Sequence, residues 1–293
     1  MLTTFLFSIS FFSCSDSTIE EPQQKAEAPL SSQQEKTVPP KEERIVSLGG
    51  NITETIFALG EGEHIVAVDA SSLYPKEVLE LPKVGYYRQV SSEGILSSEP
   101  SIIIASDATG PKEVIEQIKK IGIPLTQVPS QKNLKGTEER IQKIAALLNK
   151  TPEGEKLIEQ IHSDLKEIQK PEQTPKVLFI YARGGGTLSV AGTNTAASEM
   201  IKLAGGTNAI QEYEGYKPLN AESIIVAAPD YILLTARGLS SIGTIDDVLA
   251  LKGISETPAA KNKRIISMDD LLLLGFGPRT GKAAVELSKL LQQ

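Results

Sequence analysis

Short apolar runs alternate with longer amphipathic stretches along most of the chain from Arg44 onward. The short runs are rich in β-branched residues and predict strands, whereas apolar residues spaced three and four apart, closed by glycine, predict helices. The first strands are expected at 44–50, 64–69, 101–106 and 123–128, and the first helices at 51–60 and 111–122. This alternation predicts a parallel sheet covered by helices.

The pattern changes between Thr137 and Lys170, where two helical stretches follow each other without a strand. The second stretch has an apolar face with His162 at its edge, which favours an ordinary surface histidine. That face consists of Leu157, Ile158, Ile161, Leu165 and Ile168. The strand and helix alternation then restarts, with strands expected at 176–182 and 231–236 and a helix at 194–204.

Two distant segments share one template, which indicates an internal repeat. In each, a glutamate is followed seven residues later by a proline and then by an apolar strand: Glu93 and Pro100 in the first, Glu222 and Pro229 in the second. We therefore expect an α/β fold of two Rossmann-like lobes with parallel sheets, joined by a long backbone helix, with a ligand cleft between the lobes. The expected divisions are a signal segment that ends at the cysteine (1–14), a tether (15–43), the N-terminal lobe (44–136), the connecting helices (137–174) and the C-terminal lobe (175–293).

Three loops are expected to face one another across this cleft, because ligand sites lie at the carboxyl ends of parallel strands. They are 84–89 (VGYYRQ), 181–192 (YARGGGTLSVAG) and 235–243 (TARGLSSIG). A connecting helix absorbs little dihedral change, so we expect only a small closure of the lobes. The glycines at 184–186 lack the lysine and spacing of a phosphate-binding loop, and they predict a tight turn.

The N-terminal segment predicts export and a membrane tether. Residues 1–13 form a short apolar run that has the length of a signal-peptide core, and Ser13 precedes Cys14, the single cysteine. This arrangement resembles the lipobox of bacterial lipoproteins, in which the cysteine is lipidated, although Phe11 and the lack of an early basic residue depart from that pattern. Residues 15–43 are rich in Ser, Gln, Glu and Pro, and they predict a disordered tether.

Composition excludes several classes of function. The net charge is −7 and the basic residues are scattered, so nucleic acid is not an expected partner. His64 and His162 with one cysteine do not supply a Cys/His zinc site or an internal disulfide. No nucleophile elbow or matched catalytic set is present, so we do not expect an enzyme.

Separated motifs carry a family resemblance that spans the chain from about residue 44 onward. They read VGYYR at 84–88, EGIL at 93–96 and LLGFG at 273–277. With these motifs the chain resembles the helical-backbone substrate-binding proteins that serve ABC importers of haem, corrinoids and iron siderophores. It is most similar to the periplasmic haem-binding branch.

The resemblance implies that Tyr86 is the axial ligand of haem iron. Tyr87 is the competing candidate, and in an extended segment the two side chains would point to opposite faces. Arg88 and Arg237 are expected to support the phenolate electrostatically, or in the case of Arg237 to pair with a propionate. Some relatives carry a histidine in the turn that here reads Ala182-Arg183-Gly184, so Arg183 is expected to contact haem without supplying a second iron ligand.

The resemblance also implies partners. Glu93 and Glu222 are expected to dock onto arginines of a transmembrane permease dimer, although a glutamate in the first turn of a helix is also favoured by the helix dipole. We therefore expect a monomeric periplasmic or extracytoplasmic lipoprotein, anchored by lipid, that delivers haem to an ABC importer. The alternatives are a corrinoid or ferric-siderophore binder and, in another class, a haem-handling enzyme or a surface adhesion module.

Overall fold

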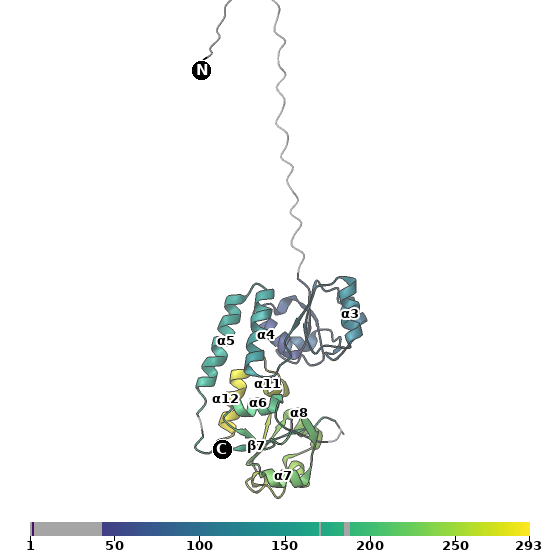
Figure 1. Ribbon diagram of the computed structural model, residues 1–293. Coiled ribbons are helices and arrows are strands. Elements are labelled where there is room, and N and C mark those ends of the chain that lie inside the picture. Colours follow the sequence, from purple (N-terminus) through teal and green to yellow (C-terminus); the bar gives the residue numbers. More distant parts are fainter. Residues whose placement is uncertain (1, 3–42, 170, 185–187) are drawn as a thin grey trace, which may run out of the picture. The chain divides into compact units, whose positions relative to one another are not determined.

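The computed structural model describes Leu2 and residues 43–169, 171–184 and 188–293. The chain separates into two units, Met1–Lys41 and Glu42–Gln293, and the second contains the folded body (Figure 1). The proposed lipidation site Cys14 and all of the tether except Glu43 lie outside the described residues. Within the described ranges, none of the helices combines the length and apolar character that crossing a membrane requires.

The N-terminal lobe is built on a four-stranded sheet in the order β2-β1-β5-β6, and all of its pairings are parallel. The four strands expected from the sequence are confirmed as β1 (Ile45–Leu48), β2 (Ile65–Val68), β5 (Ile102–Ser106) and β6 (Leu125–Val128). The helical segments of this lobe are α1 (Gly50–Ala58), η1 (Gly62–His64), η2 (Lys76–Glu80), α2 (Ser92–Ser97) and α3 (Lys112–Ile121).

Both faces of this sheet are buried, as the continuous apolar strands require. Along β1, Ile45 packs into one apolar cluster together with α1 and the helix α4 (Leu134–Leu147). Val46 and Leu48 pack into a second cluster with Ile95 of α2 and Ile118 of α3. Successive side chains of a strand therefore serve opposite cores.

The helix α5 (Thr151–Lys166) connects the two lobes and contacts the cores of both. Leu157, in its first half, packs against the N-terminal cluster that includes α4. Leu165 and the following Ile168 pack against a C-terminal cluster that includes α12 (Thr280–Leu290). The 16 residues of α5 span about 24 Å. The expected backbone helix is therefore confirmed, and its apolar face is divided between the lobes (Figure 1).

The C-terminal lobe has a six-stranded sheet in the order β10-β8-β7-β11-β12, with β9 also paired to β7. Strands β7, β9, β11 and β12 pair in parallel, as expected, and β8 and β10 are antiparallel additions that make the sheet of this lobe mixed. The strands are β7 (Lys176–Tyr181), β8 (Ser189–Ala191), β9 (Thr207–Asn208), β10 (Tyr216–Pro218), β11 (Tyr231–Thr235) and β12 (Ile265–Met268).

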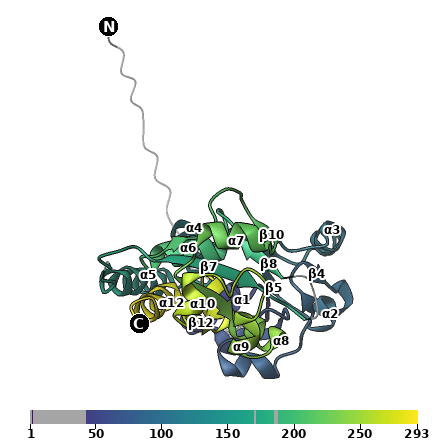
Figure 2. The ribbon, with the colours of Figure 1, turned by 90° about the horizontal axis from the view of Figure 1, so that it is seen from below.

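Helices cover both faces of this second sheet (Figure 2). Helices α6 and α12 contribute to one core cluster, and α7 and α9 to the other. Leu273 of α11 adds to the first of these clusters, and Ala259 of α10 and Leu239 of α8 add to the second. The set is α6 (Ala196–Leu203), α7 (Ala221–Ala227), α8 (Ala236–Ile242), α9 (Ile245–Leu249), α10 (Pro258–Lys261), α11 (Asp270–Leu274) and α12.

Two of the segments expected to be loops contain regular structure. Residues 236–242 form α8, because the Thr235 hydroxyl accepts a hydrogen bond from the Gly238 N–H at 3.0 Å and caps the helix. The segment 181–192 includes β8, which pairs antiparallel with β7. In the sheet, β8 lies between β7 and β10, a pairing that short polar and glycine-rich stretches do not reveal in the sequence.

The internal repeat is confirmed in backbone detail. Ser91 and Asn220 cap α2 and α7 with their side chains, so Glu93 and Glu222 occupy the same helical position in the two lobes. Each helix is followed by a non-glycine residue with positive φ directly before the proline. These residues are Glu99, with φ 47°, and Ala228, with φ 46°. The same helix-to-strand connection has therefore been used twice.

The lobes are joined by a short C-terminal segment that the N-terminal lobe holds by its backbone carbonyls. Asn51 Nδ2 donates to the Gly275 oxygen at 2.9 Å, and an Arg140 guanidinium N–H donates to the Phe276 oxygen at 2.6 Å. Arg140 is fully buried at 1% exposure. The LLGFG segment singled out in the sequence thus serves as a structural joint between the lobes.

Candidate functional site

The VGYYRQ segment forms a β-hairpin of β3 (Gly85–Tyr86) and β4 (Gln89–Val90), with Tyr87 and Arg88 at the turn. Gly85 has a φ of 100°, and a Cβ atom there would lie 2.6 Å from the Gln89 carbonyl oxygen. Only glycine satisfies both conditions without strain. The glycine before the tyrosine pair is therefore required by the hairpin itself.

Neighbouring loops fix the hairpin from both sides. The Ala70 N–H donates to the Gly85 oxygen at 2.7 Å. On the other side, the Gly110 N–H donates to the Tyr87 oxygen at 3.0 Å, and its carbonyl accepts from the Val90 N–H at 2.9 Å. The backbone of the tyrosine pair is thus attached to the loops that follow β2 and β5.

A buried carboxylate, Asp69, organises the base of the hairpin. It has no solvent exposure and accepts the Gly49 N–H at 2.9 Å, the Ser72 hydroxyl at 2.8 Å and the Tyr87 N–H at 3.2 Å. It also accepts the N–H and hydroxyl of Ser71, at 2.8 and 2.6 Å. Asp69 therefore links the ends of β1 and β2 to the tyrosine pair. Its position as the last residue of the strand expected at 64–69 was the available signal in the sequence.

The two tyrosine rings contact each other, with centroids 4.6 Å apart and planes at 62°. The opposite orientation expected for an extended segment does not arise, because the chain turns at Tyr87 and does not continue as a strand. Burial raises the pKa of Tyr87 to about 12, and a hydrogen bond and charge interaction with Tyr86 add to this. Tyr87 thus stays a neutral phenol at physiological pH and can donate its proton in a hydrogen bond to the Tyr86 oxygen.

Arginines from both lobes lie over these rings. Arg183, which follows β7 in the C-terminal lobe, has its guanidinium carbon 5.9 Å from the Tyr86 ring centroid. Arg88 lies over Tyr87, at 5.2 Å. We call Tyr86, Tyr87, Arg88 and Arg183 the interlobe site. The sequence analysis expected Arg88 and Arg237 to support Tyr86, whereas the arginine that lies over that ring is Arg183.

Arg237 is not joined to this site in the part of the chain that the structure describes. Its side chain is exposed, and its backbone N–H donates to the Asp270 carboxylate at 3.2 Å. Its predicted role toward Tyr86 or a propionate stays a prediction.

Glu93 and Glu222, the expected docking residues, are both exposed at the starts of α2 and α7. Neither forms a side-chain hydrogen bond or ion pair with another residue in the described ranges. Their carboxylates are therefore available to a partner.

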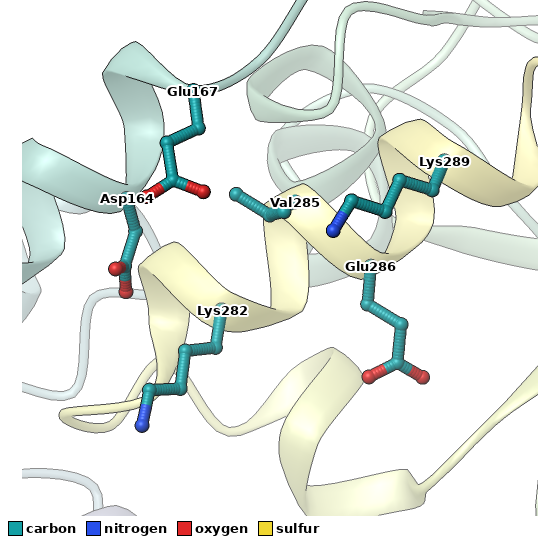
Figure 3. Close-up of a pocket in the computed structure, with 6 residues that line it drawn as sticks. All are labelled: Asp164, Glu167, Lys282, Val285, Glu286 and Lys289. Atoms are coloured by element: carbon teal, nitrogen blue, oxygen red, sulfur yellow. The ribbon is translucent and has the colours of Figure 1, made fainter.

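A separate groove of about 300 Å³ lies between α5 and α12 (Figure 3). Its lining is mainly charged and includes Asp164 of α5, Glu167 directly after that helix, and Lys282 and Lys289 of α12. None of its lining residues belongs to the interlobe site. The groove lies on the connecting helix, so we do not assign the ligand to it.

The chain belongs to the periplasmic binding protein family, whose model matches residues 45–272. This family consists of solute-binding proteins. Two curated relatives are each 29% identical: the uncharacterized ABC transporter substrate-binding lipoprotein YvrC of Bacillus subtilis and a vitamin B12-binding protein of Vibrio parahaemolyticus. The first alignment covers 88% of this chain and 82% of the relative, and the second covers 84% and 88%.

Among solved structures, the chain is similar to the periplasmic heme-binding protein RhuT from Roseiflexus sp. RS-1 in its apo form. The two share 42% sequence identity with a TM-score of 0.82, and the match covers 85% of this chain and 98% of that one. The architecture of two lobes joined by a backbone helix is therefore that of a substrate-binding protein.

Proposed function

We propose that this chain is an extracytoplasmic haem-binding protein that holds ferric haem through the Tyr86 phenolate and delivers it to an ABC importer. The observation that carries the proposal is the tyrosine pair on a fixed hairpin, with Arg183 of the opposite lobe over the Tyr86 ring. The similarity to a periplasmic heme-binding protein at 42% identity supports it.

The chemistry of the site fits this ligand. A phenolate is a hard anionic donor suited to ferric iron, and tyrosine is a known proximal ligand of haem. A phenol ordinarily titrates near pKa 10, so the bound cation must displace its proton. Tyr87, which retains its own proton, would stabilise the neighbouring phenolate by donating a hydrogen bond. The nearby guanidinium groups of Arg88 and Arg183 add positive charge.

Absorption spectroscopy of purified protein titrated with hemin tests the assignment. Wild type and Tyr87→Phe should give the spectrum of a high-spin ferric phenolate complex, whereas Tyr86→Phe should lose it and bind hemin on the order of 100-fold more weakly, about 2.7 kcal/mol. A phenolate spectrum that survives in Tyr86→Phe and disappears in Tyr87→Phe would move the ligand to Tyr87. The Tyr→Phe change alters only the hydroxyl, so packing of the two rings is retained.

A corrinoid is the second candidate, because one curated relative is a vitamin B12-binding protein. Titration with cyanocobalamin beside hemin separates the two. Tight binding of cyanocobalamin together with absence of a phenolate spectrum for hemin would favour the corrinoid.

We also propose that Glu93 and Glu222 dock onto the permease and that Cys14 carries a lipid anchor. The equal positions of the two glutamates in repeated helices support the docking role. In cells, the double variant Glu93→Lys/Glu222→Lys should keep wild-type hemin affinity but lose haem uptake, while Glu159→Lys on the exposed surface of α5 should not affect uptake. Unchanged uptake in the double variant would remove the docking role. Release of the protein from membranes by Cys14→Ala would test the anchor.

A further inference from the structure

Lys132, in the loop between β6 and α4, lies at the joint between the lobes. Its ammonium group donates to the Gly275 carbonyl oxygen at 2.9 Å, the same oxygen that accepts from Asn51. An ammonium group has three N–H donors, and this is its one hydrogen bond within the described residues. A neutral carbonyl does not compensate the positive charge, so Lys132 lacks a direct anionic partner there.

The surroundings of Lys132 carry an excess of positive charge. Burial is the main cause that lowers the pKa of Lys132 to about 7, and the positive charges of Arg140 and Arg88 lower it further. Among the described groups that act on this charge, Asp69 alone is negative. Its two oxygens already accept hydrogen bonds from Gly49 and from the loop and hairpin around it. The position therefore favours an additional anion.

Arg88 connects this position to the interlobe site. Its guanidinium lies over Tyr87 at the tip of the hairpin, and its charge also acts on Lys132. A ligand held by Tyr86 can thus present an anionic substituent toward Lys132 and Arg88 together. Carboxylate is a good match, because a charge-assisted hydrogen bond to an ammonium is about twice as strong as a neutral one.

We propose that Lys132 receives a carboxylate of the bound ligand and selects carboxylate-bearing macrocycles over those whose side chains are neutral amides. The inference rests on the proposed function and adds the feature that distinguishes its two candidates. Haem bears propionates, whereas the corrin ring of vitamin B12 bears amides. An amide bound beside Lys132 would leave the cationic group without compensation, which costs affinity.

Hemin and hemin dimethyl ester provide the test, because methylation of both propionates removes their negative charge and leaves the macrocycle unchanged. Both are titrated into the full chain as wild type, Lys132→Met, Lys132→Gln and Lys132→Arg. Lys135→Met is the matched control, because Lys135 is on the exposed side of α4 with 82% side-chain exposure. Wild type, Lys132→Arg and Lys135→Met should bind hemin at least 10-fold more tightly than the ester. In Lys132→Met and Lys132→Gln this preference should fall to about 2-fold or less.

The ratio of the two affinities within one variant is insensitive to a general loss of stability. Two neutral replacements of Lys132 are included so that the test can still be made if one of these variants does not fold. If Lys132 serves only as a joint between the lobes, its replacement should weaken the binding of hemin and of the ester equally, and the preference for hemin should persist. That result would overturn the inference about Lys132 but not the proposed function, because wild type would still bind hemin. Wild-type protein that binds neither ligand would overturn the proposed function and this inference with it.

Discussion

Breaking the ion pair between Glu54 and Arg279 tests how firmly the lobes are held together. Glu54 on α1 is buried with 4% side-chain exposure, and its two carboxylate oxygens accept from Arg279 Nε at 2.9 Å and Nη2 at 2.8 Å. The Arg279 N–H donates to the same carboxylate at 3.3 Å, and its guanidinium lies 3.6 Å from the Tyr74 ring centroid. The perturbation is Glu54→Ala.

The expected cost follows from this geometry. Removing one partner of a buried ion pair costs about 3–5 kcal/mol, because the remaining charge loses its compensation. Burial alone would lower the pKa of Arg279, but the hydrogen bond and charge of Glu54 raise it above its ordinary value. Arg279 keeps 21% side-chain exposure and can recover some hydration, so we expect the lower end, about 3 kcal/mol.

Urea denaturation followed by far-UV circular dichroism measures the effect. Glu54→Ala should lower the midpoint, and its transition should broaden or divide in two if the lobes unfold separately once the joint is weakened. Lys135→Ala is the control, because it breaks a surface pair with Glu139 at 3.7 Å and should cost less than about 0.5 kcal/mol.

A double replacement separates the ion pair from simple packing. Glu54→Met combined with Arg279→Met should cost clearly less than the sum of the single changes, because no unpaired charge is left. A loss below about 0.5 kcal/mol in Glu54→Ala, or strict additivity in the double variant, would refute the reasoning.

Three further outcomes follow from the hairpin and its surroundings. Gly85→Ala should cost about 2 kcal/mol in thermal or urea unfolding and weaken hemin binding, because φ is 100° and the new Cβ would meet the Gln89 oxygen at 2.6 Å; unchanged hemin affinity would contradict the role of the hairpin. Asp69→Ala should lower stability by about 3 kcal/mol and broaden the hemin titration, since a buried acceptor for several N–H and O–H groups is lost, including Tyr87 N–H. The pKa of Lys132 is about 7 in the folded chain, against an ordinary value of 10.5. Between pH 7 and pH 10.5 the unfolded chain therefore binds more protons than the folded chain. Wild type should therefore gain stability relative to Lys132→Met as pH rises from 7 to 9, by about 2 kcal/mol in urea denaturation, and a parallel pH dependence of the two proteins would exclude this pKa.

The strands and the connecting helix were predictable because their signals are local. A β-branched run such as 101–106 reads as a strand whatever surrounds it, and α3 is bounded by Pro111 and by Gly122 in a left-handed conformation, as its sequence indicates. The repeated spacing from glutamate to proline was also visible, since it depends only on order along the chain.

The parts that sequence did not predict depend on residues far apart. Lys132 is one lysine among many in the sequence, and the carbonyl that accepts its hydrogen bond is 143 positions away. Arg183 lies over Tyr86 only because the two lobes are joined, and the tip of the hairpin becomes a turn through contacts with Gly110. Long-range packing, which no local pattern encodes, determined each of these outcomes.

Under the proposed docking of Glu93 and Glu222 onto a permease dimer, the repeated connection that places the two residues alike has a consequence for avidity. A rigid protein that meets a dimeric partner through two equivalent contacts makes the second contact at an effective concentration that can reach the millimolar range. Each carboxylate can then be weak by itself, which permits rapid release after delivery. Loss of either carboxylate should therefore remove more than half of the gain in affinity that the two contacts provide together. Weakening the joint at Glu54 and Arg279 should also weaken docking, although neither contact residue is changed.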